Sequence, residues 1–169
     1  LEVLSASQAE KDEERLKKLA DDDFKAIFKS FDEDGKTIMC AHRGQRDGKH
    51  MLSEAKKAVL DRFEGHTPHK VVCVDSPKGC PDQDLHSDYG DALIQDIEEK
   101  DPEAQIYNIM YTPQARPFRY VPKGTHVPKI VTLPAGAVTA FEGTLVHSGM
   151  AWNGPGSNRA QHCFVLPKG

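Results

Sequence analysis

The chain has 169 residues, of which 38% are hydrophobic and 28% are charged, and its formal net charge is −4. This length suits one globular domain with its own core, and the balanced composition argues against disorder. No stretch gathers enough lysine and arginine to follow a phosphate backbone, and no apolar run approaches the roughly 20 residues that cross a bilayer. We therefore expect a soluble, intracellular protein that binds neither nucleic acid nor membrane, and a targeting segment upstream of Leu1 stays open.

The first part of the chain is predicted to be largely helical. Apolar residues at helical spacing predict an amphipathic helix over residues 7–31, in which Ser7 and Glu10 form a capping box. The turn FDEDG and a short β-like run over residues 36–41 follow. The turn is not a calcium loop, because its glycine and a closing glutamate do not fall at the places that such a loop requires. A second helix is predicted over residues 53–64. Residues 1–69 thus form a helical support region.

Residues 70–169 are predicted to form the core of the same single domain, 1–169. A strand over residues 70–76 leads into a loop rich in proline and glycine, and a helix over residues 90–100 follows. After Pro102, short apolar or alternating runs are separated by proline and glycine at near-regular intervals: QIYNIMY, FRYV, KIVTL, AVTAFEG, TLVHSG and AQHCFVL. The expected fold class is mainly β with flanking helices (α+β), with helices packed on one sheet of a small barrel or jelly roll.

Two residues that follow the proline- and glycine-rich loop, and one in a later strand, form a candidate metal site. In an extended strand, side chains i and i+2 point to the same face, so His86 and Asp88 can present an imidazole and a carboxylate side by side. His147, in TLVHSG, is the best-placed third ligand. Two histidines and one carboxylate that leave positions open favour non-haem Fe(II). Taken singly, His147 could instead be a core histidine, and Asp88 could cap the following helix.

Arg159 opens the last predicted strand, soon after the third candidate ligand. If its side chain enters the same cavity, its planar guanidinium can bind a dicarboxylate in a bidentate way. The alternative role for Arg159 is an ordinary ion pair. His162 lies on the same strand and faces the side opposite to Arg159 if strand alternation is unbroken.

Together these motifs resemble the Fe(II)/2-oxoglutarate-dependent oxygenase superfamily, with its phytanoyl-CoA and prolyl-hydroxylase-like members. The resemblance rests on QDLHSD, AGAVTAFEGTLVHSG and NRAQHCFV, within residues 83–169. It implies a double-stranded β-helix core, Fe(II) bound by His86, Asp88 and His147 as the catalytic centre, and the distal carboxylate of 2-oxoglutarate bound by Arg159. It also implies that O₂ and 2-oxoglutarate are consumed, that succinate and CO₂ are released, and that an unidentified small-molecule or protein substrate is hydroxylated.

Two further parts of the co-substrate site follow from the resemblance. Members often add a tyrosine or asparagine that binds the keto-acid end, for which Tyr107, Asn108 and Tyr111 in IYNIMYTP are the candidates. Many relatives carry serine or threonine two places after the arginine, where this chain has Gln161, whose amide can donate a similar hydrogen bond.

Two alternative functions share the predicted barrel. The first is a cupin-type metalloenzyme, although cupins favour an HxH arrangement with a following glutamate and this chain has HxD. The second is a non-catalytic binding module that keeps the barrel without turnover. Dependence on 2-oxoglutarate would separate an oxygenase from both. Neither the oligomeric state nor the substrate follows from the sequence.

Overall fold

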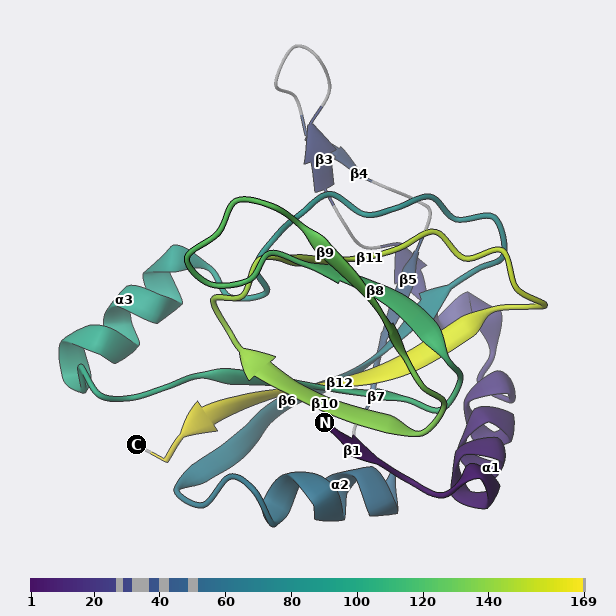
Figure 1. Ribbon diagram of the computed structural model, residues 1–169, viewed down its shortest axis with the longest axis horizontal. Helices are drawn as coiled ribbons and strands as arrows, with labels where there is room; N and C mark the ends of the chain where they lie inside the picture. Colours follow the sequence, from purple (N-terminus) through teal and green to yellow (C-terminus); the bar gives the residue numbers. More distant parts are fainter. Residues whose placement is uncertain (27–28, 32–36, 40–42, 49–51, 169) are drawn as a thin grey trace.

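The computed structural model describes residues 1–26, 29–31, 37–39, 43–48 and 52–168. Its strands form two antiparallel sheets that face each other, together with a separate hairpin of β3 (Lys29–Phe31) and β4 (Thr37–Met39) (Figure 1). The larger sheet has the order β1-β10-β7-β12-β6-β5-β2, and the smaller has the order β11-β8-β9. The predicted fold class, mainly β with a jelly-roll core and flanking helices, is confirmed.

The larger sheet is built from both ends of the chain. Its strands are β1 (Glu2–Val3), β2 (Lys25–Ala26), β5 (Gly44–Asp47), β6 (His66–Ser76), β7 (Tyr107–Thr112), β10 (Ala137–Glu142) and β12 (Asn158–Pro167). The smaller sheet consists of β8 (Arg116–Tyr120), β9 (Lys129–Leu133) and β11 (His147–Gly149). Strands β6 and β12 are the longest, and they pair along their whole length with one register shift between Phe164 and Val165. These two strands run through the centre of the larger sheet.

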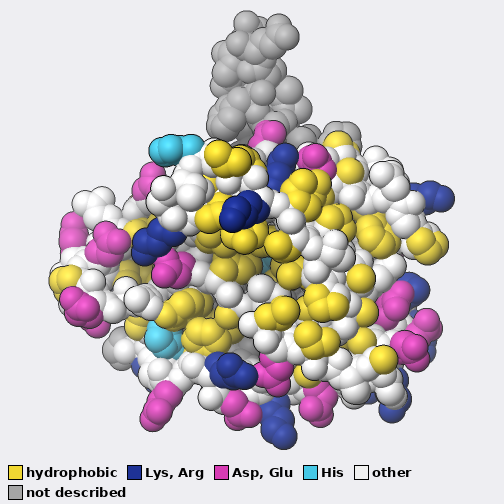
Figure 2. Space-filling model, viewed as in Figure 1, with side chains coloured by type: hydrophobic (Ala, Val, Ile, Leu, Met, Phe, Trp, Pro, Cys, Tyr) yellow, Lys and Arg dark blue, Asp and Glu magenta, His cyan; other side chains and the backbone are white. Residues whose placement is uncertain are grey.

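Side chains alternate between the two faces of the larger sheet. On the inner face, one apolar cluster joins the two sheets: Met110, Phe118, Leu133, Ala137 and Ala160. On the outer face, a second cluster joins the sheet to α2 (Ser53–Leu60): Ile109, Tyr111, Val138, Cys163 and Val165, with Ala55 and Ala58 of the helix. Figure 2 shows hydrophobic side chains gathered over the middle of the face seen in Figure 1, with most charged groups toward its rim.

Helix α1 (Ala6–Lys17) is shorter than predicted. Its N-cap is Ser5, whose hydroxyl accepts a hydrogen bond from the Gln8 amide, and not the predicted pair of Ser7 and Glu10. Beyond Lys17 the chain turns through η1 (Asp21–Asp23) into β2. The helix prediction to residue 31 is wrong because the acidic run at 21–23 interrupts the apolar face and the following residues pair as strands.

The other predicted elements differ mainly at their ends. Helix α2 stops at Leu60, and β6 begins at His66, earlier than predicted. Helix α3 (Asp91–Lys100) matches its predicted range and projects beside the sheets with no fully buried residue (Figure 1). Residues 32–36, most of the FDEDG turn, lie outside the described residues. Residues 1–69 supply β1, β2 and β5 to the larger sheet, so this region gives strands as well as helical support. None of the described helices has the length and apolar character needed to span a membrane.

Candidate metal centre

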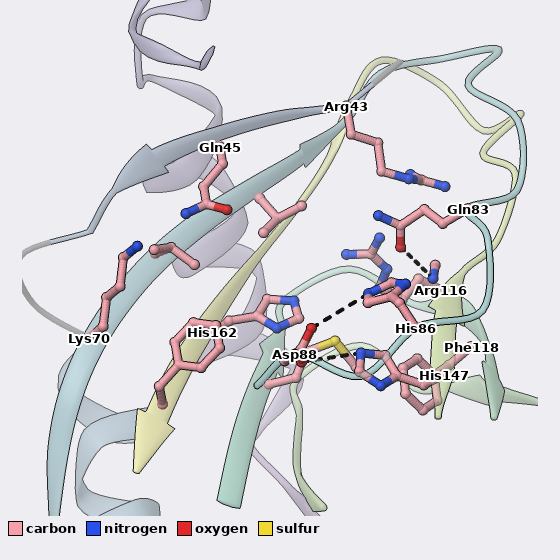
Figure 3. Close-up of a pocket in the computed structure, with 15 residues that line it drawn as sticks. Arg43, Gln45, Lys70, Gln83, His86, Asp88, Arg116, Phe118, His147 and His162 are labelled. Atoms are coloured by element: carbon pink, nitrogen blue, oxygen red, sulfur yellow. Dashed lines mark hydrogen bonds and ion pairs between the residues drawn. The ribbon is translucent and has the colours of Figure 1, made fainter. Parts of the chain in front are cut away.

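His86 and His147 face each other across a single antiparallel β-bridge. The amide of each donates to the carbonyl of the other, at 3.0 Å and 2.9 Å. His147 begins β11, whereas His86 lies after β6, outside the named strands. Asp88 follows His86 and turns its carboxylate toward both imidazoles (Figure 3). The bridge therefore brings together residues that are far apart in the sequence.

The three side chains place their ligand atoms close together. All of these atoms lie within 4.8 Å of one another. Asp88 Oδ2 lies 3.2 Å from His147 Nε2, and Asp88 Oδ1 lies 3.5 Å from His86 Nε2. Asp88 does not cap α3, because the cap is Gly90 and no side chain caps that helix end. The sequence-based grouping of these three residues thus matches their arrangement in space.

Backbone carbonyls orient both imidazoles. His86 Nδ1 lies 2.7 Å from the Asp84 carbonyl, and His147 Nδ1 lies 2.8 Å from the Leu145 carbonyl. A carbonyl only accepts, so each Nδ1 carries a proton and donates it, and each Nε2 lone pair faces Asp88. A carboxylate that faces two lone pairs is repelled unless a cation or a proton lies between them. The donor set therefore fits a metal ion.

The ionisation of the site follows from the same contacts. Burial opposes the charged form of Asp88, yet hydrogen bonds with His147 and His86 outweigh it and hold the pKa of Asp88 below its usual value. Burial likewise opposes protonation of His86, but Asp88 and the Asp84 carbonyl raise its pKa. When no metal ion is bound, a proton on an imidazole can thus bridge that ring and the Asp88 carboxylate.

Aromatic side chains pack around the ring of His147. The ring stacks on Phe118 at 5.6 Å between centroids, and Phe141 contacts it at 4.9 Å. Only 4% of His147 is exposed. This packing fixes the ring orientation and leaves the Nε2 side open to the space between the sheets.

A cavity of about 280 Å³ opens beside the three ligands. This volume is close to the lower end of the roughly 300–1,000 Å³ typical of small-molecule sites. The inner faces of β6 and β12 form much of its wall, through Lys70, Val72, Val74, His162 and Phe164. Lys70 and Gln45 lie at one end of the cavity, and Arg43 and Gln83 lie at the other (Figure 3).

Arg159 lies on the outer face of the larger sheet, away from this cavity. Its guanidinium donates to the carbonyls of Leu16 and Leu19 at the end of α1, and it forms ion pairs with Asp75 and Asp21. The prediction that Arg159 enters the metal cavity is wrong, and the alternative of an ordinary ion pair describes its contacts. Alternation along β12 is regular at this point, so residue 159 faces outward and His162 faces inward, as unbroken alternation predicted.

Three further candidates for co-substrate binding also face outward. Gln161 Oε1 accepts a hydrogen bond from the Leu52 amide. The Tyr111 hydroxyl donates to the buried Asp12 of α1 at 2.6 Å. Tyr107 packs on Phe63 with 4.9 Å between ring centroids. The assignment of Gln161, Tyr107 and Tyr111 to the co-substrate is therefore wrong, since all three contact the outer layer of the fold.

Asn108 differs from the two tyrosines beside it. It is fully buried on the inner face of β7, and its Nδ2 donates a hydrogen bond to Asp88 Oδ2. It is not among the residues that line the cavity. Asn108 thus contacts a candidate metal ligand rather than the cavity itself.

Arg116 is a cavity residue that the sequence reasoning missed. It is 7% exposed, its Nη2 donates to Ser76 Oγ at 2.9 Å, and its buried Nη1 has no hydrogen-bond partner in the described part of the chain. Arg43 binds the same hydroxyl at 2.6 Å. Burial and the nearby charge of Arg43 lower the pKa of Arg116 to about 10, so it stays charged at neutral pH. A signal was present, because in RPFRY this arginine shares a strand face with Phe118.

The sheets and the candidate centre together define a type of fold. Facing antiparallel sheets with a His-Asp-His group between them give this chain a 2-oxoglutarate/Fe(II) oxygenase-like fold, and the resemblance seen in the sequence is confirmed at that level. A scan of protein-family models and a search of curated sequences both gave no significant match.

Comparison with solved structures gives the individual similarities. The crystal structure of HygX from Streptomyces hygroscopicus with nickel and 2-oxoglutarate bound matches with a TM-score of 0.66 and 11% identity, over 98% of this chain and 80% of HygX. HygX with hygromycin B also bound matches with a TM-score of 0.64 and 12% identity, over 98% and 80%. AviO1 from Streptomyces viridochromogenes Tue57 matches with a TM-score of 0.57 and 14% identity, over 97% and 86%. Identities this low establish the shared fold alone.

Proposed function

We propose that this protein is an Fe(II)- and 2-oxoglutarate-dependent dioxygenase that hydroxylates its substrate and releases succinate and CO₂. The observation that carries the proposal is that His86, Asp88 and His147 line the same cavity as a buried arginine, Arg116. The fold shared with HygX, whose crystal structure holds nickel and 2-oxoglutarate, supports it.

His86, Asp88 and His147 would hold the metal through two imidazole nitrogens and one carboxylate. The group found among the described residues contains these three ligands, which leaves coordination positions for a chelating 2-oxo acid and for O₂. When bound, Fe(II) supplies the redox chemistry that couples O₂ reduction and decarboxylation of the 2-oxo acid to oxidation of a substrate bond. The protein's own part is to orient these groups and to keep bulk water from them.

Arg116 takes the role that the sequence had assigned to Arg159. Its Nη1, which has no partner among the described residues, can donate to the distal carboxylate of 2-oxoglutarate, while Ser76 holds the guanidinium in place. Apolar side chains of Val74 and Met110 line the same cavity and suit the methylene groups of the co-substrate. A buried guanidinium without an ion-pair partner in the described part of the chain is energetically costly, and a bound dicarboxylate would neutralise its charge.

The opposite end of the cavity is left for the substrate. Lys70, Gln45 and His162 line that end, and Lys70 is exposed to solvent. These side chains offer hydrogen bonds to a polar group. The structure of HygX with hygromycin B, nickel and 2-oxoglutarate bound supports a small molecule as the class of substrate.

Anaerobic titration of the purified protein with Fe(II) and 2-oxoglutarate tests the function. Wild type should develop the weak visible charge-transfer absorption of a 2-oxo acid chelated to iron, and aerobic incubation should form succinate. Arg116→Met should weaken 2-oxoglutarate binding roughly 10- to 100-fold, the value of a hydrogen bond to a charged group. Lys70→Met, a second cavity cation, is the matched control and should bind the co-substrate as wild type does.

The same titration separates the alternatives. A cupin-type metalloenzyme would bind metal but develop no absorption with 2-oxoglutarate, and a non-catalytic module would form no succinate. Either result would overturn the proposal. Loss of 2-oxoglutarate binding in Lys70→Met but not in Arg116→Met would instead indicate that the co-substrate binds in the opposite orientation in the cavity.

A further inference from the structure

Asn108 lies directly behind the candidate ligand Asp88. It occupies the middle of β7, opposite Phe141 of β10 on one side and Phe164 of β12 on the other. Its Nδ2 donates to Asp88 Oδ2, which is also the oxygen 3.2 Å from His147 Nε2. The amide therefore contacts the carboxylate at the oxygen that faces one of the two imidazoles.

The other end of this amide is left unsatisfied. Asn108 Oδ1 is buried and has no hydrogen-bond partner among the residues that the structure describes. Turning the amide around would place Oδ1 against Asp88, so that two acceptors would meet without a proton between them. Asp88 thus dictates the orientation of the amide.

A purely structural role would favour a different residue at this place. An apolar side chain between Phe141 and Phe164 would leave no buried polar atom unpaired, whereas asparagine leaves one. What asparagine provides here, and an apolar residue could not, is therefore the hydrogen bond from its Nδ2, and that bond goes to a candidate metal ligand.

We propose that Asn108 is a positioning residue of the metal centre, which holds the Asp88 carboxylate in the orientation that meets both His86 and His147. This inference rests on the proposed metal site and extends it to a residue that does not itself touch the metal. Partners that orient metal ligands in this way typically contribute 10- to 100-fold to metal affinity. Asn108 would contribute on that scale through Asp88.

The test uses Co(II) alone as the probe, added anaerobically to the full chain. The variants Asn108→Leu and Asn108→Ala both remove the donor, one with an apolar side chain of similar size and one with a smaller side chain. Both should bind Co(II) roughly 10- to 100-fold more weakly than wild type and show a changed visible ligand-field spectrum. Agreement between them assigns the effect to the lost donor rather than to volume, and the alanine variant serves alone if the leucine variant does not fold.

Asn158 provides a matched control. It is also fully buried in the larger sheet, its Nδ2 donates to the Ala115 carbonyl at 3.2 Å, and its Oδ1 likewise has no partner among the described residues. Asn158→Leu should keep the Co(II) affinity and spectrum of wild type. Wild-type binding in the Asn108 variants, or equal weakening in Asn158→Leu, would overturn the positioning role while the metal site stands. Absence of Co(II) and Fe(II) binding by wild type would instead refute the proposed function.

Discussion

Arg159 and Asp75 occupy directly paired positions of β12 and β6, and their side chains form an ion pair with 3.1 Å between Nε and Oδ1. The same guanidinium also binds the carbonyls of Leu16 and Leu19 and lies over the ring of Phe24, 4.4 Å from its centroid. One arginine thus joins the end of α1 to the centre of the larger sheet, on the side away from the metal centre.

Replacing Arg159 with leucine should therefore destabilise the fold and leave the proposed co-substrate site unchanged. The change leaves the Asp75 carboxylate and two helix-end carbonyls without their donor, and we expect a loss of about 2–4 kcal/mol in the free energy of unfolding. Denaturant unfolding of the metal-free protein measures this. Unchanged stability together with weaker 2-oxoglutarate binding would restore the sequence-based assignment of Arg159.

Removal of any one candidate ligand should abolish metal binding. His86→Ala, Asp88→Ala and His147→Ala each leave two ligands, too few to hold the ion against dilution and chelators. Metal content after gel filtration measures the effect. His162→Ala changes a histidine of the same cavity and should retain the metal, so a loss there as severe as in the other three would contradict the ligand assignment.

His162 should make the metal-free protein sensitive to acid. Burial lowers its pKa to about 4 from the usual 6.5. As the pH decreases, His162 is therefore protonated near pH 6.5 in the unfolded chain but only near pH 4 in the folded chain. Because the unfolded state binds more protons between these two values, the free energy of unfolding falls as the pH decreases through this window. Relative to His162→Gln, wild type should lose roughly 2 kcal/mol between about pH 7.5 and pH 5. Parallel pH dependences for the two proteins would show that His162 takes up its proton normally.

Tyr111 should matter to stability rather than to the co-substrate. Its hydroxyl is the donor to Asp12, a carboxylate with 0% exposure, so Tyr111→Phe leaves a buried charged group short of one hydrogen bond. We expect a loss of about 1–3 kcal/mol in unfolding free energy. Tyr107→Phe is the control, because that ring packs at a more exposed position on Phe63. If Tyr111→Phe instead required more 2-oxoglutarate for activity, Tyr111 would contribute to co-substrate binding after all.

The sequence by itself determined the core strands and the grouping of three candidate metal ligands. Short runs with β-type composition, separated by proline and glycine, gave the positions of β7 to β12 because strands and turns are encoded locally. The candidate ligands could be recognised because side chains i and i+2 of an extended strand share a face, and because the motifs that contain the two histidines resemble those of a known superfamily. The N-terminal helix was overestimated because apolar spacing alone does not show where the acidic run at 21–23 ends the helix.

Only the tertiary structure decided which arginine faces the cavity. Strand β12 is covered on both faces, so its residues show no alternation of polar and apolar character that would identify the inner face. A shift of one residue in register exchanges the two faces of a strand, and the pairing of β12 with β6 and β7 settles that register. Arg159 therefore faces α1, whereas Arg116 meets Arg43 and Ser76 from distant parts of the chain at the cavity wall.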